Sequence, residues 1–189
     1  MPENLAKIFW LVFFLILGGA AILFILPSFW LRLLFGLALF VILAWTIRFD
    51  QKDNAGALSL IAAYIVSVAQ FALQFVFSLP AWLIMIFAFV WVSVIFWVSL
   101  RLHLGSITGA ARILSLVAGL AGAEIALALM FWPTHFLVTA TVFFLLFYLL
   151  WITAHFYISG LLNRHRVIIH TALVSILIGV ILIIAEWTI

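Results

Sequence analysis

The chain has 189 residues, of which 70% are hydrophobic and 7% are charged, and its formal net charge at pH 7 is +3. A soluble domain has about 45–50% apolar and about 25% charged residues, so the composition excludes an ordinary globular fold and predicts an integral membrane protein. The sequence contains no cysteine, which excludes a disulfide framework, thiolate catalysis and thiolate metal sites. Its few basic residues lie in short polar segments, which favours a role in membrane topology and predicts no binding to nucleic acid.

The apolar runs of the sequence predict seven transmembrane helices. Each run is about twenty residues long and lacks the apolar–polar alternation of barrel strands, so the helical bundle is favoured. In chain order, the expected spans cover residues 8–26, 29–47, 56–78, 81–100, 113–132, 134–159 and 167–185. Tight turns at Pro27, Pro80 and Pro133 join the first six spans into three hairpins, and the seventh span follows alone. We expect one all-α membrane domain over residues 1–189.

The basic residues predict the orientation of the spans. Only Arg32 falls near the side of the proline turns, whereas the opposite side carries Lys7, Arg48, Lys52, Arg101, Arg112, Arg164 and Arg166. The positive-inside rule then places the N-terminus in the cytoplasm and, after seven crossings, the C-terminus outside. The alternative is six spans with an interfacial last helix, but the length of that helix and its lack of internal charge argue against it.

The three prolines lie at a constant interval of 53 residues. Hairpins that cross one bilayer have similar lengths, which accounts for the interval without duplication. A true internal repeat is the other interpretation, and repeats often frame binding sites of transporters at the membrane midplane.

Polar residues within the spans form the first candidate site. Glu124 lies about 13 Å below the turn at Pro133, at a rise of about 1.5 Å per residue, and Arg32, Gln70 and Gln74 share the same half of the bilayer. An ionisable group at such depth is costly unless it is paired or solvated. The hypothesis is an intramembrane cluster of Glu124, Arg32, Gln70 and Gln74 that opens toward the outside, with His135 and Thr139 near it.

Each member of this cluster also has a purely structural interpretation. Arg32 can extend to the outer headgroups. The two glutamines can form hydrogen bonds between helices, each worth about 0.6 kcal/mol. Glu124 can be a protonated carboxyl group that is bonded to a backbone carbonyl.

The span at 113–132 carries a stripe of small residues, which consists of Ser115, Ala118, Gly119, Gly122 and Ala126. This small-xxx-small pattern permits close approach of another helix. Ala121 and Ala128 lie on the side of Glu124, so the helix has small residues on two sides. We therefore expect a central position for this helix, with Glu124 facing protein or a cavity. The same pattern allows a homo-oligomer or a larger membrane complex to form through the stripe.

The cytoplasmic side holds the second candidate site, a rim that binds anionic lipid headgroups. It consists of Arg101, His103, Arg112, His155, Arg164, His165 and Arg166. A basic residue near a membrane surface contributes about 1 kcal/mol to such binding. The five histidines show neither an HExxH motif nor paired positions at matched depth, so we expect no metal site and no cofactor.

The sequence favours a non-enzymatic membrane component, either permease-like or a subunit or scaffold within the bilayer. Phosphate-binding loops and catalytic elbows are absent, and no polar segment between spans exceeds about a dozen residues. The alternative is an intramembrane enzyme that acts on a lipid or lipid-linked substrate, with Glu124 or the rim as acid–base group. In hydropathy alone the chain is similar to small multi-pass proteins of bacterial genomes, which implies a location in a cytoplasmic membrane.

Overall fold

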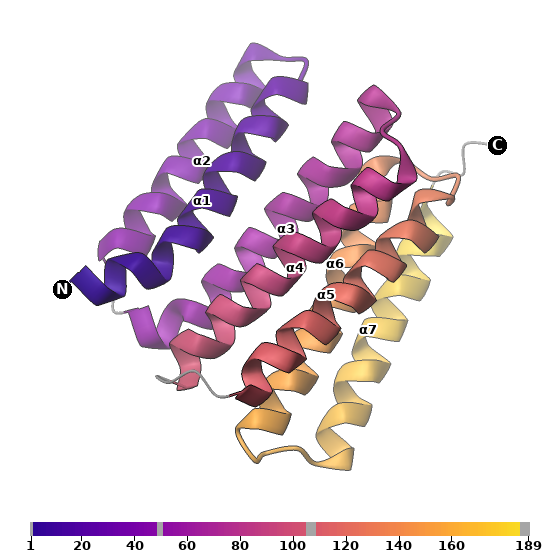
Figure 1. Cartoon of the computed structure of the whole chain (residues 1–189). Coiled ribbons are helices and arrows are strands. Elements are labelled where there is room, and N and C mark those ends of the chain that lie inside the picture. The colour runs from indigo at the N-terminus through magenta and orange to yellow at the C-terminus, as the bar shows by residue number, and fades with distance from the viewer. Residues whose placement is uncertain (1, 49–50, 105–108, 186–189) are drawn as a thin grey trace.

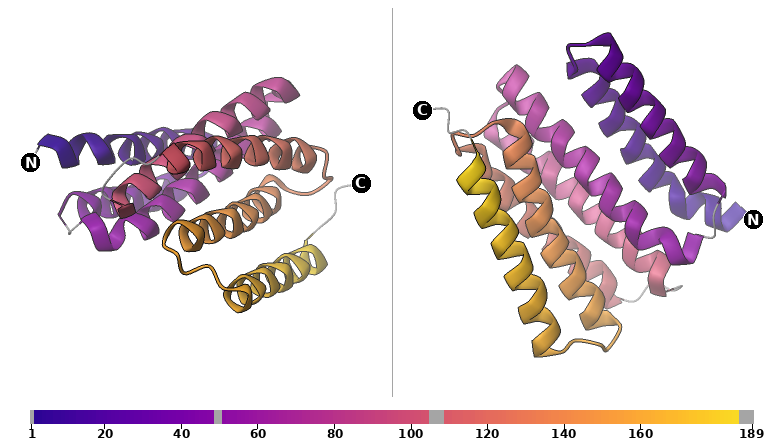
Figure 2. Two further views of the ribbon diagram at one scale, coloured as in Figure 1. Left: turned by 60° about the horizontal axis from the view of Figure 1, so that its bottom comes forward. Right: turned by 180° about the vertical axis from the view of Figure 1, so that it is seen from behind.

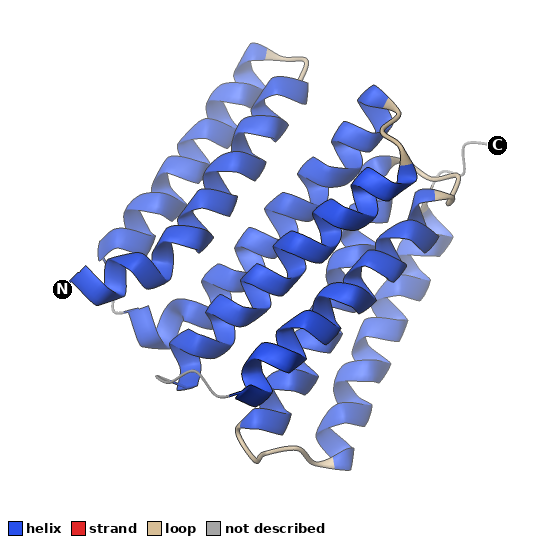
Figure 3. Ribbon diagram, in the orientation of Figure 1, coloured by secondary structure: helices blue, strands red, loops and turns tan. Residues whose placement is uncertain are grey.

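A computed structural model describes residues 2–48, 51–104 and 109–185, with side chains for 9–42, 56–102 and 109–185. Within these residues the chain folds into helices without a β-strand (Figure 3). The helices are α1 Pro2–Ile25, α2 Phe29–Arg48, α3 Gln51–Phe77, α4 Ala81–Leu104, α5 Gly109–Met130, α6 Phe136–Ile158 and α7 Arg164–Ile184. The predicted all-α fold is confirmed.

Within the described residues, five helices are long and apolar enough to cross a membrane: α3 over Gly56–Phe77, α4 over Ala81–Leu102, and all of α5, α6 and α7. Shorter apolar segments of α1 and α2 cover Phe9–Ile25 and Phe29–Ile42. Several helices continue past the expected spans at the basic side, so Arg101, Arg112 and Arg164 lie in helical ends and not in loops. A helix satisfies its own backbone hydrogen bonds, so it can extend beyond the hydrocarbon region into the polar interface.

The helices run up and down in succession, and α3 and α4 occupy the middle (Figures 1 and 2). The α1–α2 hairpin covers one side, where α1 packs on α3 and α4, while α2 packs on α1. On the other side α5 packs on α4, α6 packs on α3 and α5, and α7 packs on α6. The two edge helices, α2 and α7, are therefore covered by protein on one side only.

The three turns that contain proline lie at the same end of the molecule, called the proline end below (Figure 1). At the second turn, the left-handed Ser78 (φ 49°) ends α3, and its amide donates to Gln74 O at 2.9 Å. The carbonyl of Pro80 then accepts from Leu83 N at 3.0 Å, which starts α4. At the third turn His135 Nδ1 accepts from Leu137 N and caps α6. These local bonds close the second and third hairpins within a few residues.

The last turn, between α6 and α7 at the opposite end, reverses the chain direction at a glycine. Gly160 has φ +66°, a left-handed conformation that glycine adopts without a steric penalty. Its amide donates to Tyr157 O at 3.2 Å, and Leu161 N donates to Phe156 O at 3.0 Å, which together form a Schellman cap. Asn163 Oδ1 then accepts from His165 N at 3.1 Å and starts α7.

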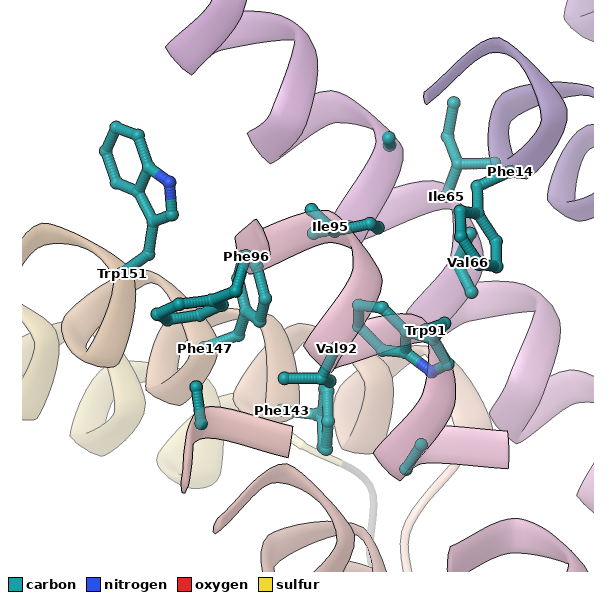
Figure 4. Packing of buried hydrophobic residues seen from close by; sticks show 14 of the residues in the cluster. Phe14, Ile65, Val66, Trp91, Val92, Ile95, Phe96, Phe143, Phe147 and Trp151 are labelled. Carbon is teal, nitrogen blue, oxygen red and sulfur yellow. The ribbon is translucent and has the colours of Figure 1, made fainter. Parts of the chain in front are cut away.

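The core lies where α3, α4 and α6 meet (Figure 4). Trp91 of α4 is fully buried, and its ring lies 5.6 Å from that of Phe143 and 5.7 Å from that of Phe147, both on α6. Phe96 adds an edge-on contact to Phe147 at 5.3 Å. Such aromatic pairs contribute about 0.5–1.5 kcal/mol each beyond the area that they bury. These rings fix α6 against the central pair of helices.

Small residues determine the contact between α4 and α5. The predicted stripe is buried, and a Cβ atom added at Gly119 would overlap Ser93 Oγ and lie 2.8 Å from Phe89 O. A Cβ atom at Gly122 would lie 2.9 Å from a methyl group of Val92. The predicted close approach is therefore confirmed, and its partner is α4 of the same chain. This stripe is occupied within the chain and does not offer a free surface for a second copy.

Candidate functional site

Gln70 is the member of the predicted cluster that is most deeply buried, with 1% of its surface exposed. It lies on α3, and its Oε1 atom accepts a hydrogen bond of 2.7 Å from Nε1 of Trp91 on α4. The Nε2 atom is buried and has no hydrogen-bond partner among the described residues. A buried donor without a partner costs about 1–3 kcal/mol, so this amide group needs an explanation.

Gln74 lies one turn closer to the proline end and lines a different pocket. This pocket holds about 230 Å³ between the ends of α3, α5 and α6, and its polar lining includes Gln74, Ser78, Thr134 and Thr139. The hydroxyl groups of Thr134 and Thr139 lie 3.0 Å apart and share a hydrogen bond, whereas the buried Oε1 atom of Gln74 has no partner in the described part of the chain. The structure thus separates the two glutamines, which share a face of α3, into two sites.

Arg32 and Glu124 are not brought together. Arg32 is exposed on α2, and its Nε atom donates to Leu26 O at 2.7 Å, which closes the first turn of the chain. Glu124 is exposed on α5, on the far side of the central helices from α2 (Figure 1). The α1–α2 hairpin packs on α3 and α4, so equal depth in the bilayer does not make these two residues neighbours.

The expected inward position of Glu124 is also wrong. The buried stripe of α5 includes Ser115 and Gly122, and at about 100° per residue Glu124 projects to the opposite side of the helix. Leu116, Val117 and Leu120 are exposed beside it. The alanines on that side do not indicate burial, because an alanine side chain is apolar enough to face lipid or a groove.

An apolar groove lies beside this exposed face of α5. It holds about 510 Å³ over α6, between α5 and α7. Its walls are formed by Phe96, Leu114, Val117, Ala118, Ala121, Leu149, Leu150, Thr153, Ala154, Tyr157, Leu162, Val167 and Thr171. The groove therefore combines aliphatic walls with three hydroxyl groups, and it contains neither a carboxylate nor an imidazole.

The rim residues predicted for the cytoplasmic side lie at one end of the bundle but differ in their surroundings. Arg112, Arg164 and His165 are exposed. The guanidinium of Arg101 lies 5.5 Å from the ring of Trp97, and that of Arg166 lies 5.6 Å from the ring of Phe156.

The imidazole of His155, the sixth rim residue with a described side chain, stacks on Trp151 at 5.4 Å. The side chain of His103 lies outside the described residues.

Two further contacts were not found from the sequence. The indole of Trp91 packs in the core and also orients Gln70 through its N–H group. Tyr148 and His170 hold α7 to α6 through a hydrogen bond of 3.0 Å between the hydroxyl group and Nδ1. Both contacts join different helices, and the sequence does not show which helices are neighbours. Only the polarity of each residue indicated that it could form a hydrogen bond.

Within the part of the chain that the structure describes, no group of three or more His, Cys, Asp or Glu residues could hold a metal ion. Comparison with protein-family models, with curated proteins and with solved structures finds no match to this chain.

Proposed function

We propose that the chain is a seven-span protein of a bacterial cytoplasmic membrane, with its N-terminus inside, that acts as a non-enzymatic subunit embedded in the bilayer. The proposal for topology rests on the five helices that are long enough to cross, on the apolar segments of α1 and α2, and on the asymmetry of basic residues. The rim of Arg101, Arg112, Arg164, His165 and Arg166 then faces the cytoplasm and binds anionic headgroups.

Reporter fusions test this topology. We expect a periplasmic reporter such as alkaline phosphatase to be active when fused after Ile189 and inactive when fused after Ser159, because α7 crosses the membrane between these positions. A cytoplasmic fluorescent reporter at the same two positions should give the opposite pattern. Alkaline phosphatase activity after Ser159, or its absence after Ile189, would contradict the seven crossings.

The exposed position of Glu124 is the observation that supports a role as a subunit. A charged or strongly polar group that faces lipid at this depth costs at least a few kcal/mol. The cost is avoided when another protein surface covers this face of α5. The described chain supplies no such cover, because α4 occupies the opposite face of the helix.

A second copy of the chain is the proposed cover. In a two-fold dimer with its axis along the membrane normal, a residue near the axis meets its own copy at the same depth. Each Glu124 side chain then faces the other copy instead of lipid, and a hydrogen bond between the two side chains offsets the cost of their depth. The exposed Val117 and Leu120 supply apolar contact on the same face.

The natural absence of cysteine makes this dimer directly testable. We expect Leu120→Cys to form a disulfide-linked dimer in oxidised native membranes, because Leu120 is 57% exposed beside Glu124. Phe40→Cys is the matched control: it lies at the same depth below its own proline turn and is 69% exposed on α2. We expect it to stay monomeric.

Substitution of Glu124 separates the contribution of the hydrogen bond to dimer formation from that of the apolar contact. Glu124→Leu in the Leu120→Cys background should lower dimer formation by about fivefold, equivalent to about 1 kcal/mol for an interhelical hydrogen bond. Glu124→Gln should retain dimer formation, since an amide also donates and accepts. Equal cross-linking at Leu120→Cys and Phe40→Cys, or none at either, would overturn self-association.

An enzyme that acts on lipids is the second candidate, because the groove between α5 and α7 is large enough for an acyl chain. Neither Glu124 nor a rim residue lines this groove, and His155 stacks on Trp151. The groove therefore favours lipid contact over lipid chemistry.

A further inference from the structure

The orientation of the Gln70 amide is fixed by its neighbour. An indole N–H can only donate a hydrogen bond, so the atom that faces Trp91 Nε1 at 2.7 Å is the amide oxygen. The NH₂ group must then point away from Trp91, and it has no acceptor among its surroundings. Trp91 is itself held by Phe143 and Phe147 (Figure 4), so this arrangement does not depend on a mobile side chain. Two buried N–H donors are therefore left unpaired on a rigid support.

Gln70 lines a pocket that is otherwise apolar. The pocket holds about 350 Å³, within the range of small-molecule sites, and its remaining walls are seven aliphatic or aromatic side chains of α3, α4 and the turn between them. Leu83, Ile86 and Val90 form an exposed rim on α4, so the pocket opens sideways, toward the lipid when α4 crosses the membrane. A ligand that enters from the bilayer meets Gln70 as the single polar side chain of the pocket lining.

We infer that this pocket binds an isoprenoid quinone, with one ring carbonyl accepting a hydrogen bond from Gln70 Nε2. The unpaired donor requires an acceptor, and a ketone oxygen supplies one without bringing a charge into an apolar site. The pocket walls offer branched aliphatic side chains that suit the isoprenoid tail, and Phe87 offers an aromatic surface for the ring.

The depth of Gln70 distinguishes a quinone from a phospholipid ester. Gln70 lies seven residues before the end of α3 at Phe77, or about 10 Å along the helix axis. The ester carbonyls of a phospholipid stay near the boundary of the hydrocarbon core, because their charged phosphate must remain hydrated. A quinone carries no charged headgroup, so its carbonyl can reach this depth.

Binding of decylubiquinone to the purified full-length chain tests the assignment. At a fixed concentration of detergent micelles, we expect saturable quenching of tryptophan fluorescence by the wild-type protein. Gln70→Leu should weaken binding by about tenfold, because it removes the donor of the hydrogen bond. Gln74→Leu is the matched control, since it alters the same helix one turn away and lies outside this pocket. It should bind as the wild type does.

A second variant keeps the proposal testable if Gln70→Leu does not fold. Ile86→Trp fills the pocket from its exposed rim and should abolish saturable binding, whereas Ile176→Trp on the exposed face of α7 should leave binding unchanged. Absence of saturable binding to the wild type, or equal binding by Ile86→Trp and Ile176→Trp, would overturn the proposal. Equal competition by dioctanoyl phosphatidylglycerol would also overturn it, in favour of a glycerolipid ester.

Discussion

Trp91→Ala is expected to lower the free energy of unfolding by about 3 kcal/mol, the low end of the range for deleting a buried aromatic ring. Trp91 is fully buried and contacts Phe143 and Phe147 across the α4–α6 interface. Between helices in a bilayer the gain from leaving water is absent, since lipid is as apolar as the core. The loss therefore comes from missing van der Waals contacts, from the cavity, and from the Gln70 amide that loses its remaining partner.

Equilibrium unfolding in mixed detergent and dodecyl sulfate micelles, followed by circular dichroism, measures this loss. Trp82→Ala is the matched control, because Trp82 lies on the same helix but is 61% exposed. It should change the free energy of unfolding by less than about 0.5 kcal/mol. Trp91→Phe should fall between the two, since it keeps most of the ring contact and loses only the indole donor. Equal losses for Trp91→Ala and Trp82→Ala would show that this core does not stabilise the bundle.

Much of the fold could be predicted because hydropathy and turn residues are visible directly in the sequence. Runs of about twenty apolar residues identify helices, and Pro27, Pro80 and Pro133 mark three of the reversals between them. The buried stripe of α5 could also be predicted, since Gly119 and Gly122 have no side chain to keep another backbone away. Both inferences need only the spacing of residues along one helix.

The candidate cluster was harder to predict, because residues at the same depth in the membrane can lie on helices that are far apart in the bundle. Arg32 and Glu124 were placed in the same half of the bilayer, yet α2 and α5 lie on opposite sides of the central helices. Gln70 was recognised as a buried polar residue, but its partner Trp91 lies on another helix, and α3 and α4 could meet along several faces. The expectation that Glu124 faces inward relied on Ala121 on the same side of the helix. It was wrong because an alanine side chain can face protein, lipid or a groove.

Gly119→Val is expected to destabilise the α4–α5 interface by about 3 kcal/mol, the upper end of the usual cost of overpacking. The added Cβ atom would overlap Ser93 Oγ, which a small rotation can relieve. It would also lie 2.8 Å from the carbonyl oxygen of Phe89, which is a backbone atom and can move only if α4 shifts as a whole. Such a shift would disturb the contacts of Trp91 on the same helix, so the cost extends beyond the interface.

The same unfolding measurement separates this contact from the intrinsic effect of valine in a helix. Gly179→Val on α7 is the matched control, because a Cβ atom there meets nothing within 4 Å. We expect it to change the free energy of unfolding by less than about 1 kcal/mol, since valine and glycine differ little as helix formers. Adding Ser93→Ala to Gly119→Val should recover only part of the loss, because the hydroxyl group is removed while Phe89 O stays in place. Full recovery would show that the side chain of Ser93, and not the closeness of the two backbones, limits the residue at position 119.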